Sequence, residues 1–220
     1  MAAWMQYPTQ GDLAREQVHR HGFLFFDDVE NEVRDRLTRL PAETRATFAL
    51  ACATRLMTKH ERLPASEQRP FTLGWRPVID IMWSGLADER EDALQGVREA
   101  LRAYHDSPYD HDDGPDGPQD ADEDAAAASI YAAECFTHGA VEDACWAAGR
   151  AVEAAFRVAQ RELQLDPNDF IWDPDAEPMP LAKESMHPAV QSELRRQLAD
   201  LEELERAGVT TAVLQRLRQA

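Results

Sequence analysis

The stretch LPAETRATFALACATRL, residues 40–56, decides the fold class of this chain. Pro41 is well placed for the first turn of a helix, where its missing N–H costs nothing. Apolar residues then recur at four-residue spacing, at Phe48, Cys52 and Leu56. This spacing predicts a helix with one apolar face about three turns long. Much of the chain's apolar content is alanine and β-branched residues are few, which favours helix over strand throughout.

The same three- and four-residue spacing recurs along the rest of the chain. Its longest stripe lies in residues 141–163, where alanines would let two helices approach closely. A second seam of leucines, Leu194, Leu198, Leu201 and Leu204, predicts a late helix with Leu201 in the core. We therefore predict an all-α fold, a single multi-helix bundle of about seven to nine helices over residues 1–220. The expected helices are 12–20, 29–39, 41–56, 78–86, 88–104, 125–138, 141–163, 187–207 and 209–217.

Local signals mark where these helices begin and end. Gly22 ends the first helix, and the apolar run Phe23–Phe26 is expected to insert into the core as a plug. Asp27 and Asp28 are expected to supply N-cap oxygens for the next helix. Residues 61–77 hold three prolines and a glycine and predict a connection, and Gly208 suits the position after a helix end.

Residues 106–124 differ in kind from their surroundings. They contain nine acidic residues, three prolines and two glycines, with no lysine or arginine. A like-charged segment of low hydrophobicity buries too little surface to offset its ordering entropy. We predict a mobile acidic loop between two helical halves of the domain.

A partial calcium-binding register lies inside this acidic loop. Counted from Asp112 as position one, acidic or glycine residues fall at positions five, six, nine and twelve: Asp116, Gly117, Asp120 and Glu123. Position three, however, is Gly114, which offers no side-chain ligand. A solvated acidic loop is therefore the favoured interpretation, and calcium binding is the alternative.

Composition bounds the class of partner and the compartment. Lys and Arg number 23 against 41 Asp and Glu, a formal charge of −18. Such a charge repels phosphate backbones and anionic lipids, and no local basic cluster offsets it, so we predict neither nucleic acid nor membrane as a partner. The N-terminal residues lack a signal-peptide pattern, and no run of eighteen apolar residues occurs. Three cysteines, an odd count, predict reduced thiols in the cytoplasm.

The chain carries no short catalytic signature. The H-E-x-x-H, G-x-S-x-G, P-loop and G-x-G-x-x-G patterns are all missing from the sequence. Cys52 and Cys145 lie on apolar helix faces, which is typical of buried structural thiols. Cys135 follows Glu134, and an acidic neighbour raises the pKa of a thiol. We expect no catalytic residue and no cofactor.

Four residues form a candidate pocket between helices: Asp80, Trp83, Glu134 and His138. Glu134 and His138 are four residues apart on one helical face and could chelate a metal with a third ligand, for which His60, His105 and Glu142 are candidates. A hydrogen-bonded surface pair is the favoured alternative, so no metal is predicted.

Four of the tryptophans, Trp75, Trp83, Trp146 and Trp172, could line a pocket together. Core packing is the favoured interpretation for all four.

Three stretches together resemble the YjaG-like family of bacterial proteins, a domain of unknown function. They are residues 40–56, with Ala51-Cys52-Ala53-Thr54-Arg55 as an A-C-x-x-R-type helix, residues 78–86, VIDIMWSGL, and the His187–Glu193 segment. The resemblance covers roughly 29–207 and implies a single all-helical cytosolic domain with no assigned activity. The acidic loop and the Phe23–Phe26 run depart from the family pattern. Relatives of this general kind can act as immunity proteins in toxin systems.

Two hypotheses for function follow. The first is a non-catalytic acidic protein-binding protein, such as an immunity or antitoxin-like inhibitor that covers the cationic surface of a basic toxin. The second is a small-ligand-binding protein or enzyme that uses a polar pocket between helices. Acidity that serves only solubility is the plain alternative to the first.

Overall fold

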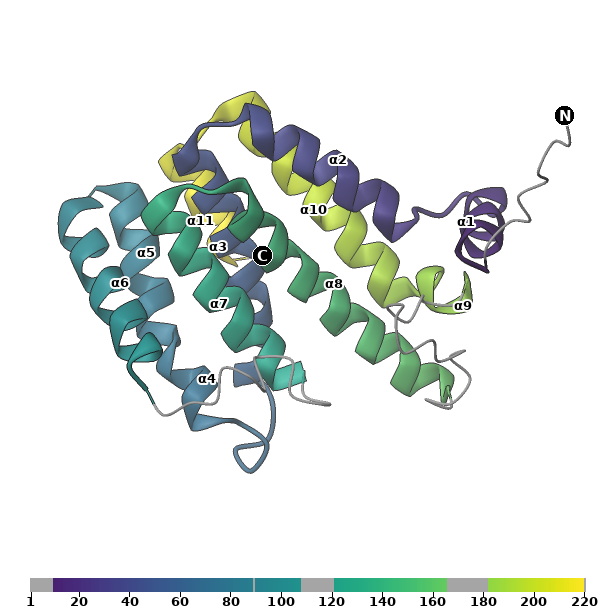
Figure 1. Ribbon diagram of the computed structural model, residues 1–220, viewed down its shortest axis with the longest axis horizontal. Helices are drawn as coiled ribbons and strands as arrows, with labels where there is room; N and C mark the ends of the chain where they lie inside the picture. The colour runs from purple at the N-terminus through teal and green to yellow at the C-terminus, as the bar shows by residue number, and fades with distance from the viewer. Residues whose placement is uncertain (1–9, 89, 108–120, 166–181, 220) are drawn as a thin grey trace, which may run out of the picture.

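The computed structural model describes residues 10–88, 90–107, 121–165 and 182–219, and it is a bundle of helices (Figure 1). No strand occurs among these residues, which confirms the all-α prediction. The helices are α1 Gln10–Arg20, α2 Phe26–Arg39, α3 Ala42–Glu61, α4 Pro70–Gly74, α5 Arg76–Ala87, α6 Arg90–His105, α7 Ala121–His138, α8 Val141–Leu163, α9 Ala182–Ser185, α10 Pro188–Ala207 and α11 Thr211–Gln219. They exceed the seven to nine expected because the connections also contain two short helices, α4 and α9.

Helix α3 lies at the centre of the bundle. Every residue from Ala46 to Met57 is buried, so the single apolar face expected from Phe48, Cys52 and Leu56 understates how this helix packs. Small side chains make this arrangement possible, because alanines let neighbouring helices approach from several directions. Its most extensive contact is with α7, followed by α8.

The other helices surround α3 in recognisable pairs. Helices α7 and α8 form a hairpin, α5 and α6 pack on one side, and α2 and α10 lie along α8 on the other (Figure 1). The turn between α7 and α8 requires Gly139, whose φ of 69° is left-handed and whose Cβ would lie 2.5 Å from the Cβ of Ala42. Leu201 of α10 is fully buried, as its leucine seam predicts.

Helix α1 lies to one side of the bundle and packs with α9 around a second, smaller apolar cluster (Figure 1). Phe25 belongs to this cluster and is only 1% exposed, whereas Phe26 already begins α2. The side-chain amide of Gln191 holds the preceding residue in place. Its Oε1 accepts from Leu24 N at 3.0 Å, and its Nε2 donates to Leu24 O at 2.7 Å.

The expectation that Asp27 and Asp28 cap α2 is wrong. The N-cap is Phe25, which makes no side-chain capping hydrogen bond, and both aspartates lie inside the first turn. They pair with α1 instead, Asp27 with Arg15 at 2.9 Å and Asp28 with His19 at 2.8 Å. Acidic side chains still suit this position because they lie at the positive end of the helix dipole.

The helix that follows the acidic segment begins earlier than the sequence predicts. Helix α7 begins at Ala121 rather than at residue 125, and Asp124 has no exposed side-chain surface. Arg157 explains this burial, since its Nε and Nη2 donate to both oxygens of Asp124 at 2.9 Å. Of the predicted calcium register, residues 112–120 lie outside the described residues, and its last position, Glu123, falls in the first turn of α7.

Two helical glycines should respond in opposite ways to alanine. A Cβ on Gly85 would lie 2.4 Å from the Cβ of Ala93 and 3.0 Å from a ring carbon of Phe136, so α5 and α6 would have to separate. A Cβ on Gly96 meets only the methyls of Ile81 at 3.7 Å. We expect Gly85→Ala to lower the free energy of unfolding by about 1–3 kcal/mol, and Gly96→Ala to raise it by up to about 1 kcal/mol. Urea unfolding measures both, and equal stability of the two variants would contradict this account of the α5–α6 contact.

Candidate functional site

A buried ionic cluster links α3 to α10. The guanidinium of Arg55 donates to Glu193 Oε1 at 2.9 Å and to Asp200 Oδ2 at 2.7 Å, and each of these side chains is less than 10% exposed. Gln197 donates to the same Glu193 oxygen at 3.2 Å, and Arg196 donates to the other oxygen of Asp200 at 2.8 Å. The cluster thus satisfies charges that would otherwise be costly to bury.

The two carboxylates respond differently to this environment. Burial raises the pKa of Asp200, and the nearby Arg55 and Arg196 lower it by less. Burial also acts to raise the pKa of Glu193, but the charge and hydrogen bond of Arg55, with smaller contributions from Lys59 and Gln197, together outweigh it, so that pKa lies below its ordinary value. Glu193 is therefore the carboxylate whose ionised form the fold stabilises.

The ionic cluster and a neighbouring hydrogen bond join three stretches that are far apart in the sequence, residues 40–56, 78–86 and 187–193. Arg55 comes from the first stretch and Glu193 from the third. Thr54, beside Arg55, accepts a hydrogen bond of 2.9 Å from the indole Nε1 of Trp83 in the second stretch. The spacing of these residues in the sequence could not show that they meet.

The four residues of the candidate pocket have different partners. Trp83 is buried at 3% exposure, with its indole nitrogen bound to Thr54 as above. Asp80 pairs with Arg76 at 3.3 Å and with Arg218 of α11 at 2.8 Å.

The structure does bring Glu134 and His138 together, at 3.4 Å. His105 of α6 reaches the other oxygen of Glu134 at 3.2 Å. Among the described residues, no group of three or more His, Cys, Asp or Glu side chains is placed so that it could hold a metal ion.

The three cysteines are all free and buried. Burial raises the pKa of the Cys52 thiol to about 12, that of Cys135 to about 12, and that of Cys145 to about 11. For Cys135 the acidic contribution comes from Asp143 rather than from the adjacent Glu134. None of these thiols is therefore activated as a nucleophile at neutral pH.

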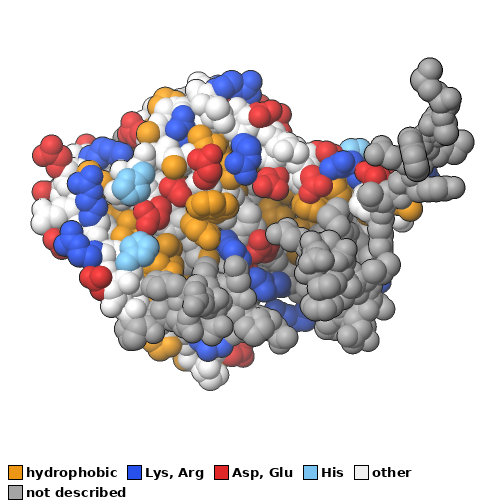
Figure 2. Space-filling view, viewed as in Figure 1, with side chains coloured by type: hydrophobic (Ala, Val, Ile, Leu, Met, Phe, Trp, Pro, Cys, Tyr) orange, Lys and Arg blue, Asp and Glu red, His pale blue; other side chains and the backbone are white. Residues whose placement is uncertain are grey.

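A groove of about 480 Å³ lies between α2 and α8, with α10 beneath it. Its floor and walls are largely apolar, and hydrophobic side chains reach the surface on this side of the molecule (Figure 2). Three acidic side chains, Asp27, Glu30 and Glu153, also line it, against a single cation, Arg150. The apolar lining includes Val29, Val33, Val152, Phe156 and Leu194.

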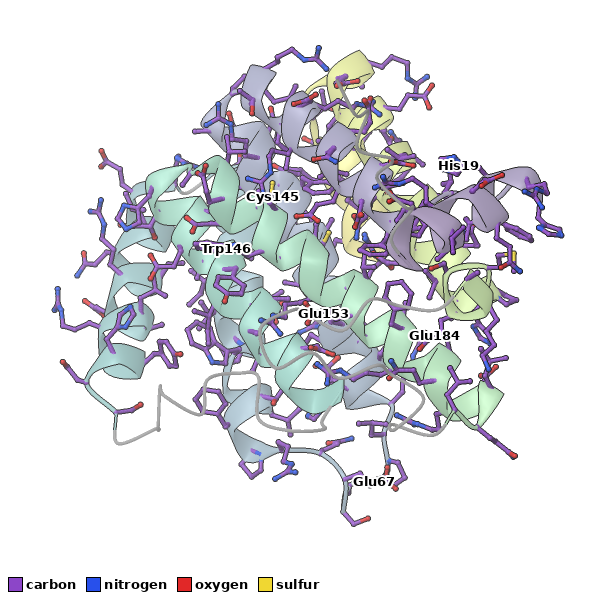
Figure 3. All side chains as sticks on the ribbon, turned by 45° about the vertical axis from the view of Figure 1, so that its right-hand side comes forward. His19, Glu67, Cys145, Trp146, Glu153 and Glu184 are labelled. Atoms are coloured by element: carbon purple, nitrogen blue, oxygen red, sulfur yellow. The ribbon has the colours of Figure 1, made fainter. Side chains whose placement is uncertain are left out.

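Trp146 lies on α8 at one end of the groove. It is 51% exposed, the largest side chain among the exposed apolar residues that the structure describes, and its ring centroid is 5.3 Å from that of Tyr131. Figure 3 shows Cys145, Trp146 and Glu153 along the same helix. The prediction of core packing is wrong for Trp146, although Trp75 and Trp83 are buried and Trp172 lies outside the described residues. A helical projection of residues 141–163 could have predicted that Trp146 is exposed, because it falls beside the alanine stripe rather than within it.

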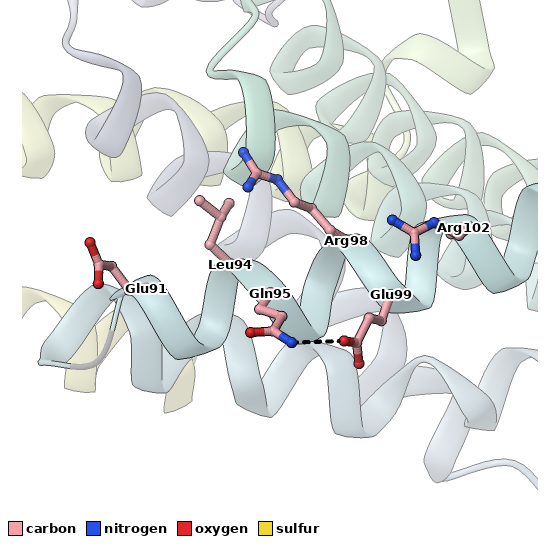
Figure 4. Close-up of a pocket in the computed structure, with 6 residues that line it drawn as sticks. All are labelled: Glu91, Leu94, Gln95, Arg98, Glu99 and Arg102. Carbon is pink, nitrogen blue, oxygen red and sulfur yellow. Dashed lines mark hydrogen bonds between the residues drawn. The ribbon is translucent and has the colours of Figure 1, made fainter.

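Two other hollows are less suited to binding than the α2–α8 groove. The one on α6 is lined by six residues of that helix alone, with Gln95 bound to Glu99 at 3.0 Å (Figure 4). A single helix surface cannot enclose a ligand. The other lies between α10 and α11 and is lined by Ala199, Glu202, Glu203, Arg206 and Arg216, of which Glu203 and Arg216 pair with each other.

Comparisons of the chain with protein-family models, curated proteins and solved structures found no match. Within the described part of the chain, none of the helices has the length and apolar character needed to cross a membrane.

The raised thiol pKa values predict slow cysteine chemistry. In the native protein at pH 7.5, we expect no thiol to react with an aromatic disulfide reagent at the rate of a free cysteine, because burial disfavours every thiolate. Unfolding in guanidinium should release three fast-reacting thiols per chain. One rapidly reacting thiol in the folded state would contradict the absence of an activated nucleophile.

Because the pKa of Glu193 is lowered in the fold, we expect the stability lost on replacing this residue to depend on pH. At pH 7, Glu193→Gln should lower the free energy of unfolding by about 3 kcal/mol, because Arg55 loses a charged partner in a buried site. A carboxylate whose folded pKa is depressed stabilises the fold above its unfolded pKa of about 4.5 and loses that effect as pH falls further. The deficit of the variant should therefore shrink below pH 4.5.

Urea unfolding from pH 3.5 to 7 measures this deficit. Glu202→Gln, an exposed change on the same helix, is the control and should stay within about 0.5 kcal/mol of wild type. A deficit that is the same at every pH would show that Glu193 acts only through its shape.

Proposed function

We propose that this protein is a non-catalytic binding protein that docks a basic protein partner over the α2–α8 groove. The observation that carries the proposal is Trp146, a half-exposed indole that ends an apolar groove with acidic edges. Exposed aromatic side chains of this kind are the residues that most often dominate protein–protein binding energy.

The chemistry of the described residues supports binding over catalysis. The three cysteine thiols are buried with raised pKa values, and the groove is lined mainly by side chains that cannot transfer protons. The buried ionic cluster around Arg55 joins two helices, and of its members only Gln197 lines the groove. An apolar groove with a few charged residues at its edges suits recognition.

The charge of the chain supports a basic partner. With a formal charge of −18, the protein attracts cationic surfaces over distances of about a Debye length. The groove itself adds little to this bias, because its three lining carboxylates already pair with arginines, Asp27 with Arg15, Glu30 with Arg34 and Glu153 with Arg150. An immunity or antitoxin-like inhibitor of a basic toxin is the form of this function that fits best, because a toxin that must hold phosphates presents the cationic surface that such an inhibitor would cover.

Capture from the native cell tests the proposal. We expect the tagged wild-type protein to retain a basic protein that Trp146→Ala loses, whereas Leu163→Ala, an exposed change on the same helix, keeps it. The association rate of the purified pair should fall about tenfold or more between 0.01 and 0.15 M salt, as the Debye length shrinks from about 30 to about 8 Å.

Two outcomes would contradict this proposal. A captured partner with an acidic binding surface removes the basis for charge complementarity. An association rate that does not depend on salt leaves the acidity of the chain as a solubility feature.

A further inference from the structure

Gly149 lies in the middle of α8 and lines the groove. A Cβ built on it meets nothing within 4 Å, so the fold itself has room for a side chain there. A glycine inside a helix costs about 1 kcal/mol relative to alanine. Gly85 shows the contrast, because there the adjacent Ala93 forbids a Cβ. Packing among the residues that the structure describes therefore does not account for Gly149.

The neighbours of Gly149 make a low wall along the groove. Cys145 and Ala148 lie one turn before it and beside it, on the same side of α8. The opposite wall is α2, with Val29 and Val33 one turn apart. Small residues between two helical walls let a third backbone come close, as glycine does where a ligand approaches the main chain.

The dimensions of the groove fit one short helix. Its lining along α8 runs from Cys145 to Phe156, a rise of about 16 Å or three turns. A volume of about 480 Å³ admits a few side chains rather than a whole element. An amphipathic helix that lies on the groove and inserts one apolar side uses such a space, by the packing of ridges into grooves.

The charged edges define the other side of that helix. Asp27 and Glu30 line the α2 side, and Glu153 lies on α8. Each of these carboxylates already pairs with an arginine of this chain, Asp27 with Arg15 at 2.9 Å, Glu30 with Arg34 at 3.6 Å and Glu153 with Arg150 at 2.8 Å. A basic partner would compete with these arginines, and its attraction to the protein comes chiefly from the net charge of −18. At the end of the groove, the exposed face of Trp146 suits a guanidinium or ammonium group, which aromatic rings attract.

We propose that the α2–α8 groove binds a basic amphipathic helix of about three turns, with a small residue over Gly149 and an arginine or lysine against Trp146. This inference rests on the proposed function and names the part of the partner that the groove receives. The three observations behind it are the steric freedom at Gly149, the exposed indole of Trp146 and the formal charge of −18 of the chain.

Fluorescence anisotropy with defined peptides tests the inference on the full chain. The probe is a labelled twelve-residue amphipathic helix of leucine, alanine and arginine, and its control carries glutamate in place of arginine. We expect the basic peptide to bind at least about tenfold more tightly than the acidic one at 0.05 M salt. Trp146→Ala and Gly149→Leu should each weaken the basic peptide about tenfold or more, since the first removes an anchor and the second fills the groove.

Alanine variants separate binding from stability. Gly149→Ala should raise the unfolding midpoint and weaken the basic peptide, because the added methyl faces the site where the peptide backbone approaches. Gly96→Ala on α6 is the matched control, since it should raise the midpoint without changing peptide affinity. Circular dichroism confirms that each variant remains folded.

The outcomes distinguish this inference from the proposed function. Equal affinity of wild type, Trp146→Ala and Gly149→Leu for the basic peptide overturns the inference, and so does equal binding of both peptides or binding of neither at millimolar concentration. Salt-dependent capture of a basic protein would then leave the proposed function standing without this groove. Groove-dependent peptide binding without any basic protein captured would overturn the proposed function instead.

Discussion

The guanidinium of Arg55 fixes where α10 lies, and the position of α10 decides the form of the groove. Because a buried charge must be neutralised, the polar residues Glu193, Gln197 and Asp200 of α10 face inward toward α3. The leucine seam of the same helix, which includes Leu201, is buried as well. One buried face of α10 is thus held both by apolar packing and by ion pairs, and sliding the helix by one turn would break both.

Two glutamines of α10 connect this buried helix to both walls of the groove. Gln197 donates to the backbone oxygen of Ala148 in α8 at 2.9 Å, next to Gly149. Gln191 holds Leu24, just ahead of α2, through both ends of its amide. The walls of the groove are therefore tied to one buried helix, and a groove that is already formed loses little entropy when a partner binds.

The predictions from the sequence were most accurate for features that depend on residues close together in the chain. Pro41 and Gly208 mark helix ends close to where the structure has them, because capping and turn geometry are local. The pairing of Glu134 with His138 follows from helical spacing in the same way. Predictions failed where a distant partner decides the outcome. Asp124 is buried because Arg157, thirty-three residues away, neutralises it.

The proposed interaction has a long-range electrostatic part and a short-range steric part, and only the first can be predicted from the sequence. Net charge is a property of composition, so the sequence alone can suggest that the protein attracts a basic surface and how salt should affect that attraction. An overall charge, however, discriminates poorly among cationic partners, since it acts over many ångströms and on all of them. Selectivity must come from short-range fit. In this chain the features that could supply it, the indole of Trp146 and the open space over Gly149, are those that the packing of its own core does not require.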